Sequence, residues 1–196
     1  MSCSDIETHP FPPFLPSNAK LLMLGSFPPP RNRWKMDFYY PNFNNDMWRI
    51  FGLVFFGDKN HFIDVTGKHF KEAQIRDFLY DKGIAIYGTA YQVRRLQNNA
   101  ADKFLQIVQP VDLTALLARI TDCRHIMTTG ELATQTLLSQ LPEHTAVPKI
   151  GQSSRAEFLG RNLCLHRLPS SSRAYPLALE KKAAAYAEAF AGAALL

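Results

Sequence analysis

Side chains that could do chemistry gather in residues 20–48 of this sequence. Four apolar residues, 21–24, precede Gly25 and Ser26, and a loop rich in proline, aromatic rings, amides and cations follows. Such a loop could hold a planar base beside a phosphate chain, because aromatic faces stack on bases while cations and amides bind phosphate oxygens. The alternative is a surface loop whose aromatic side chains pack in the core.

A second polar segment lies near the C-terminus, where residues 168–174 read Leu-Pro-Ser-Ser-Ser-Arg-Ala. The hydroxyl groups of Ser170, Ser171 and Ser172 are suited to contacts with the phosphates of DNA. A solvent-exposed turn is the alternative. A serine hydrolase is disfavoured, because the chain has no Gly-x-Ser-x-Gly sequence.

The two segments resemble the two motifs of the uracil-DNA glycosylase superfamily. Gly25 to Pro29, then Tyr39-Tyr40, then Asn45-x-x-Trp48 is similar to the first motif, and residues 168–174 are similar to the second. The similarity spans roughly residues 20–190 and is greatest to the hypoxanthine-DNA glycosylase-like and mismatch-specific uracil-DNA glycosylase branches. It implies a metal-independent, cofactor-free, monofunctional DNA glycosylase that removes uracil or hypoxanthine and initiates base excision repair.

The resemblance also suggests roles for residues of the first motif. Tyr40 occupies the position that stacks on the flipped base. Most members have Asp or Asn where this chain has Phe27, and a phenyl ring cannot orient a water. Asn45 matches an asparagine that takes this role in the hypoxanthine-type branch, since its amide oxygen can position a water beside C1′. The alternative for Asn45 is a cap at the start of a helix.

Other residues are expected to frame the base pocket: Gly25, Ser26, Phe27, Gly88 and Asp102. Relatives have an Asp where this chain has Gly88, and Asp102 is expected to brace the pocket or, alternatively, to start a helix. The motif histidine of many members is replaced by Leu168, and His166 is expected to be a structural histidine. These departures leave a second hypothesis open, a catalytically inactive or weakly active DNA-binding module of the same fold.

Basic side chains are the candidate contacts to the DNA backbone. Arg173 and Tyr175 follow the serines, where relatives carry the wedge that fills the hole left by the flipped base. The remaining candidates are Arg31, Arg33, Lys35, Arg94 and Arg95. The alternative for each is a solvated surface charge.

The elements that would position these residues alternate between strand and helix. Strands are predicted at 20–25, 83–89, 124–130 and 162–168. Helices are predicted from near Met47, with Asn45 or Asp46 as the cap, and at about 67–81, 113–120, 131–141 and 176–192. This order predicts an α/β fold with three α/β/α layers around a mainly parallel, four-stranded sheet. The four strand ends carry Gly, Ser, Thr or Pro-Ser, and in a parallel sheet they meet at one edge and can form one cleft.

Composition is that of an ordinary globular protein: 196 residues, 46% hydrophobic, with a formal charge of +5. We expect one glycosylase-like domain over residues 1–196, with an irregular arm at 1–19, that acts as a monomer on DNA. Three scattered cysteines cannot supply four ligands to an iron–sulfur cluster and suggest a reducing compartment. No segment approaches the ~20 apolar residues of a membrane span. We therefore expect a cytoplasmic protein, associated with the nucleoid if bacterial.

Overall fold

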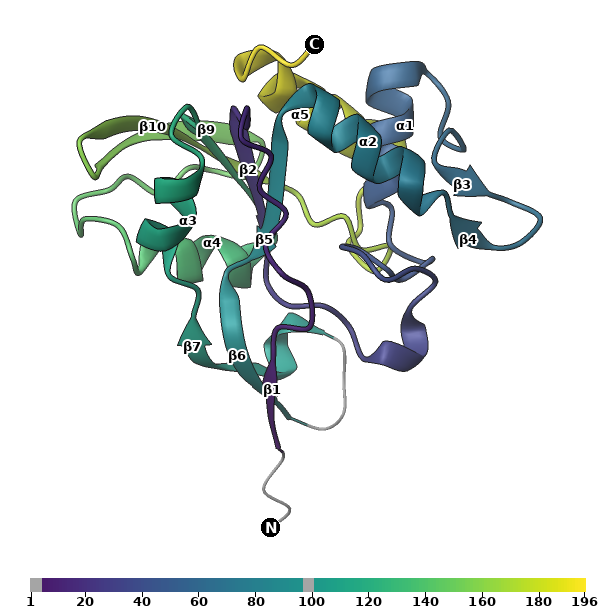
Figure 1. Cartoon of the computed structure of the whole chain (residues 1–196), viewed down its shortest axis with the longest axis horizontal. Coiled ribbons are helices and arrows are strands. Elements are labelled where there is room, and N and C mark those ends of the chain that lie inside the picture. The colour runs from purple at the N-terminus through teal and green to yellow at the C-terminus, as the bar shows by residue number, and fades with distance from the viewer. Residues whose placement is uncertain (1–4, 97–100) are drawn as a thin grey trace.

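A five-stranded sheet forms the centre of the computed structural model, which describes residues 5–96 and 101–196 (Figure 1). The strand order is β5 (Ile84–Gly88), β2 (Leu21–Gly25), β8 (His125–Thr129), β10 (Arg161–Leu168) and β9 (Gln152–Phe158). The first four strands are parallel, as the apolar runs predict, and β9 is antiparallel to β10. The prediction of a four-stranded sheet was wrong, because it omitted the edge strand β9. The sequence does not predict β9, because an edge strand exposed to water carries no continuous apolar run.

Helices cover both faces of the sheet, which confirms the three-layer arrangement (Figure 1). α1 (Met47–Phe56), α2 (Glu72–Lys82) and α5 (Leu179–Gly192) form one layer, joined by the ring contacts of Phe55 with Phe78 and of Phe51 with Phe190. α3 (Leu113–Arg119) and α4 (Glu131–Leu138) form the other layer. Side chains alternate between the two faces of a strand. On β10, accordingly, Arg161 donates to carbonyls at the end of α3, whereas His166 lies against Gly192 of α5.

A second, three-stranded sheet lies below the C-terminal edge of the central one in Figure 1, in the order β1-β6-β7. It consists of β1 (Ile6–Thr8), β6 (Ala90–Arg95) and β7 (Leu105–Pro110). The interpretation of residues 1–19 as an irregular arm was therefore wrong for β1, which pairs antiparallel with β6. Three residues are too short for a periodic signal, and β6 is too polar to predict from sequence.

Two further differences concern short elements. β3 (Ile63–Asp64) and β4 (His69–Phe70) form a small hairpin, so α2 begins at Glu72 rather than near residue 67. Single 3₁₀ turns lie at Arg31–Arg33 (η1) and Asp102–Phe104 (η2). Among the described helices, none combines the length and apolarity required to cross a bilayer.

Candidate functional site

All four parallel strands end at one cleft of about 570 Å³. Gly25, Gly88, Thr129 and Ser170 line it, each at or just after the end of a different strand, so the prediction of one cleft at this edge is confirmed. Most of the candidate residues from the sequence line the same cleft: Gly25, Ser26, Phe27, Arg33, Tyr40, Asn45, Gly88, Asp102, Ser170, Ser171, Ser172 and Tyr175. Arg31 and Arg173 are not among the lining residues.

Tyr40 is held firmly at the end of β2. Its hydroxyl group lies 3.0 Å from Oγ1 of Thr129, and its ring meets that of Trp48 edge-on. A Cβ atom at Gly25 would lie 3.0 Å from this hydroxyl, so a glycine allows the ring to approach the strand. The backbone of Tyr40 has φ +52°, in the left-handed region that non-glycine residues seldom adopt. Burial raises the pKa of the phenol to about 12, so it remains protonated.

Asn45 lies in the wall of the cleft at the start of α1. The N-cap residue of α1 is Asp46, whose side chain makes no cap hydrogen bond, whereas Oδ1 of Asn45 accepts a hydrogen bond of 2.9 Å from the backbone N–H of Met47, the first residue of the helix. The backbone of Asn45 also pairs with that of Ser172 as an isolated antiparallel bridge. A carbonyl oxygen has two lone pairs, so Oδ1 retains the capacity to accept a hydrogen bond from a water in the cleft.

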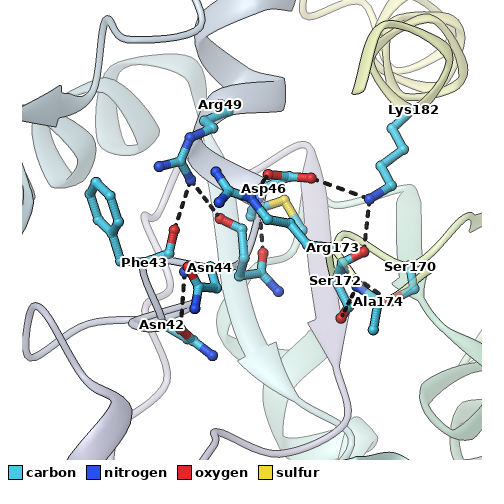
Figure 2. Close-up of polar contacts among 12 residues, drawn as sticks. Asn42, Phe43, Asn44, Asp46, Arg49, Ser170, Ser172, Arg173, Ala174 and Lys182 are labelled. Atoms are coloured by element: carbon cyan, nitrogen blue, oxygen red, sulfur yellow. Dashed lines mark hydrogen bonds and ion pairs between the residues drawn. The ribbon is translucent and has the colours of Figure 1, made fainter. Parts of the chain in front are cut away.

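A charge cluster joins the loop between β2 and α1 to the loop after β10 (Figure 2). Nε of Arg173 lies 2.9 Å from Oδ1 of Asp46, and Nζ of Lys182 lies 3.3 Å from Oδ2 of the same carboxylate. Nζ of Lys182 also donates to the carbonyl of Ser172 at 2.8 Å, and the backbone N–H of Asp46 donates to the carbonyl of Ser171. Lys182 is only 1% exposed. We name Asp46, Arg173 and Lys182 the loop clamp, because they tie together the loop between β2 and α1, the loop of residues 168–174 (the serine loop) and α5.

The serine loop is organised by its own hydroxyl groups. Oγ of Ser170 accepts from the N–H of Ser172, and Oγ of Ser172 accepts from the N–H of Ala174. Each is a local turn in which a side chain substitutes for a backbone acceptor. Ser171 is buried, so the phosphate contact expected of it does not fit its position, whereas Ser170 and Ser172 are partly exposed.

Asp102 lies at the start of η2 and contributes a carboxylate to the cleft. Oγ of Ser26 donates to its Oδ1 at 2.6 Å, which joins the loop after β2 to the segment between β6 and β7. Burial raises the pKa of this carboxyl, and the hydrogen bond from Ser26 opposes that shift. Asp102 begins the 3₁₀ turn η2, and its carboxylate also lines the cleft. The neighbouring residues 97–100, which include Asn98 and Asn99, lie outside the described residues.

His9 lines the cleft and was missed by the sequence analysis. It is 7% exposed and surrounded by the rings of Phe11, Phe27, Tyr39 and Tyr87. Burial lowers the pKa of the imidazole to about 4, so the ring is neutral at physiological pH. Its Nδ1 lies 3.0 Å from the carbonyl of Phe11, and Nε2 is buried without a partner in the described part of the chain. Only the pairing of β1 with β6 brings this residue to the cleft, and no sequence motif signals it.

The basic residues divide by burial. Arg95 is 5% exposed, pairs with Glu7 and donates to the carbonyl of Pro28, so its assignment to a DNA track was wrong. Its guanidinium instead lies over the ring of Phe27. Arg33 is exposed at the cleft, whereas Arg31 is exposed beside it and pairs with Asp37 at 3.1 Å.

The second motif carries Leu168 in place of the histidine found in many superfamily members, as the sequence indicated. Leu168 is buried and offers no polar atom to a departing base. His166 does not line the cleft; its Nε2 lies 3.0 Å from Nδ1 of His125, on the face of the sheet covered by α5. The expectation of a hydrogen-bonded histidine at this position is therefore confirmed.

Comparison with known proteins supports the fold. No family model matches the chain, and no curated protein matches its sequence. Among solved structures, the chain is similar to the solution NMR structure of a Methanosarcina acetivorans protein that carries a provisional designation as a uracil DNA glycosylase. The TM-score is 0.57 at 21% identity, and the similarity covers 94% of this chain and 99% of the other. At this identity the likeness establishes a shared α/β fold over nearly the whole chain.

Proposed function

We propose that the protein is a monofunctional DNA N-glycosylase that hydrolyses the bond between deoxyribose and a deaminated base, uracil or hypoxanthine. The observation that carries this proposal is the single cleft into which both motif loops and all four strand ends converge. An enzyme that acts on a base must flip it from the duplex into a pocket that stacks it and reads its edge. The fold shared with the Methanosarcina acetivorans protein supports the same reaction class.

Tyr40 would stack on the flipped base. Its hydroxyl bond to Thr129 and its edge-on contact with Trp48 fix the ring before DNA binds, which lowers the entropic cost of forming the stack. Stacking of a base on an aromatic side chain contributes about 1–3 kcal/mol and is tolerant of base identity. Selection of the deaminated base must therefore come from groups around the ring edge.

The hydrolytic step would depend on positioning and electrostatics. As the bond from C1′ to the base nitrogen breaks, its electron pair leaves with the base and positive charge develops on the sugar. The oxygen of a water bonds to C1′, and the proton it loses balances the proton taken up by the released base. Oδ1 of Asn45 would orient this water, and the carboxylate of Asp102 would stabilise the positive charge.

His9 would contribute to base selection at the floor of the cleft. Nδ1 of His9 lies 3.0 Å from the carbonyl of Phe11 and 3.2 Å from the backbone nitrogen of the same residue. In the tautomer that carries the proton on Nδ1, Nε2 is an acceptor, and in the other tautomer Nε2–H is a donor; the proposal requires the first. Nε2 lies beside Gly88, 3.0 Å from where a Cβ at that position would stand. The ring of uracil or hypoxanthine carries an N–H where cytosine or adenine carries a lone pair. A neutral acceptor at this position would therefore favour the deaminated bases, and it would come from the N-terminal arm in place of a side chain at residue 88.

The DNA backbone would lie along the rim of the cleft. Ser170, Ser172 and Arg33 offer donors to phosphates, while Arg173 and Tyr175 follow the serines where a wedge is required. Arg31 would add charge beside Arg33. We expect a monomer to suffice, because both loops and the arm belong to one chain.

A single-turnover excision assay would test the proposal. Single- and double-stranded oligonucleotides, each with one uracil, hypoxanthine, xanthine or ethenocytosine, are incubated with excess enzyme and then treated with alkali. We expect alkali-labile abasic sites with uracil or hypoxanthine and none with the undamaged sequence. No product with any of the four bases would contradict the proposal.

The second candidate is a DNA-binding module that does not excise bases. The replacement of the motif carboxylate or amide by Phe27, and of the motif histidine by Leu168, favours it. It predicts salt-dependent binding to the same oligonucleotides with no abasic product. Binding and excision measured on the same samples therefore separate the two candidates.

A further inference from the structure

A cluster of potential metal ligands lies on the central sheet, away from the cleft. His125 is on β8, and Cys164 and His166 are on β10. The Cα atoms of His125 and Cys164 are partners across the parallel pair, and His166 is two residues further along β10, on the same face. One ligand atom from each residue lies within 4.8 Å of the others. None of the three lines the cleft.

The surroundings of this cluster leave room for an ion. Cys164, His166 and Glu188 line a hollow of about 470 Å³ between β10 and the end of α5. A Cβ at Gly192 of α5 would lie 3.4 Å from Cε1 of His166. The absence of a side chain at Gly192 keeps the hollow open above the imidazole. Cys164 and His125 are partly exposed, so an ion can reach them.

The geometry of the two histidines is close to that of a metal site. Nδ1 of His125 and Nε2 of His166 lie 3.0 Å apart, a distance at which one ring donates a hydrogen bond to the other. In a tetrahedral zinc site with Zn–N bonds of about 2.0–2.1 Å, two ligand nitrogens are roughly 3.3 Å apart. An ion could take the place of the hydrogen-bonding proton between His125 and His166 if the two imidazole rings separate by a few tenths of an ångström.

The ligand types select the class of ion. One thiolate and two imidazoles are ligands for zinc and other borderline transition-metal ions, whereas magnesium and calcium require oxygen ligands. We propose that His125, Cys164 and His166 form a binding site for a divalent transition-metal ion of the zinc class, with a water or Glu188 in the fourth position. Such an ion would link β8 to β10 in the middle of the sheet and would serve stability, since it is separate from the cleft.

Titration of the full chain with Co²⁺ and Zn²⁺ tests this site. The protein is first treated with a chelator and dialysed, then Co²⁺ is added while the ultraviolet and visible spectra are recorded. We expect sulfur-to-cobalt charge-transfer and tetrahedral d–d bands that saturate at one equivalent and disappear when Zn²⁺ is added. The melting temperature should rise with Zn²⁺, because the ion binds only the folded state.

Variants test whether the Co²⁺ spectrum arises from the three proposed ligands. Cys164→Ala should abolish the charge-transfer band, and His125→Asn should abolish saturation at one equivalent. His144→Asn, which changes an exposed histidine outside the cluster, should leave both unchanged. No band in the wild type, or a band that persists in Cys164→Ala, would overturn the proposal.

A measurement on the wild type covers the case in which the variants do not fold. Zn²⁺ should slow the alkylation of Cys164 by an iodoacetamide reagent severalfold under native conditions, as determined by mass spectrometry of the peptides. Equal rates at Cys164 with and without Zn²⁺ would also overturn the proposal.

Discussion

Asn45 stabilises the start of α1, and we propose that the same side chain positions a water. Its Oδ1 accepts from the N–H of Met47, and the residue also lines the cleft. We predict that Asn45→Ala lowers the single-turnover excision rate by about 10²–10³-fold, as the loss of one positioned polar group does in other enzymes. The affinity for uracil- or hypoxanthine-containing DNA should change little, because Tyr40 and the rim remain.

The neighbouring Asn44 provides a matched control. It is exposed, and only its backbone N–H makes a hydrogen bond in this loop. Asn44→Ala should excise bases at the wild-type rate. If Asn45→Ala costs about 1 kcal/mol of stability, as a lost cap does, and the folded protein still excises at the wild-type rate, Asn45 is only a cap.

Asp102 allows charge to be separated from hydrogen bonding at the same position. In Asp102→Asn the amide oxygen can still accept from Ser26, but the negative charge is lost. We predict a large fall in excision rate with an unchanged or increased free energy of unfolding, because the buried charge is unfavourable. The measurements are single-turnover kinetics and urea denaturation.

The expected pH dependence of the excision rate follows from the direction in which the pKa of Asp102 is shifted. Burial raises the pKa of Asp102, and the proposed role requires the ionised form. The wild-type rate should therefore rise with pH through a midpoint above the ordinary range of a carboxyl, and this rise should be absent in Asp102→Asn. A variant with the wild-type rate and the wild-type pH profile would show that the charge has no role in the reaction.

At the scale of elements, the loop clamp decides whether the two motif loops meet. Lys182 is buried, whereas the side chain of Arg173 is 48% exposed, although both pair with Asp46. We predict that Lys182→Ala lowers the free energy of unfolding by about 3–5 kcal/mol, because it leaves a buried carboxylate without its buried partner. Arg173→Ala should cost at most about 1 kcal/mol, since water can replace an exposed partner.

Urea denaturation of the two variants makes this comparison directly. Equal losses would mean that Lys182 is not the principal partner of Asp46. A loss in Lys182→Ala that is rescued by Asp46→Asn in the double variant would confirm the pairing, because the uncompensated charge is then removed.

The same elements show what the sequence could predict. Four parallel strands were predicted because each is a short apolar run that ends in a small or polar residue, and the cleft followed from their shared edge. Lys182 was assigned to no role because its periodicity in α5 carries no sign that it is buried. Its partner Asp46 lies 136 residues away in the sequence. β1 and β9 were missed because exposed or very short strands have no apolar run, and their pairing depends on tertiary contacts.

At the scale of the whole molecule, the cleft is closed by a segment that is remote in sequence. His9 follows β1, and the pairing of β1 with β6 carries the imidazole beneath the loop after β2. The floor of the cleft therefore depends on a second sheet that lies outside the glycosylase-like motifs. Any weakening of this contact should affect stability and base selection together.

The protonation of His9 provides a test of this contact. The imidazole has a pKa of about 4 in the folded protein, against 6.5 for an unperturbed histidine. Because the folded pKa is depressed, the contribution to stability is fully present above pH 6.5 and is lost as the pH falls toward 4. The shift corresponds to about 3 kcal/mol at 1.36 kcal/mol per pKa unit.

The control is His9→Gln, which removes the titrating group. Urea denaturation at a series of pH values between 4 and 7 gives the free energy of unfolding as a function of pH. This free energy should rise less steeply with pH in His9→Gln than in the wild type. The variant should also discriminate less between uracil and cytosine, because the acceptor proposed at Nε2 is removed. If the two slopes coincide, His9 is exposed to water in solution, and neither the buried imidazole nor its role in base selection can stand. If the slopes differ but discrimination does not, the arm stabilises the cleft without reading the base.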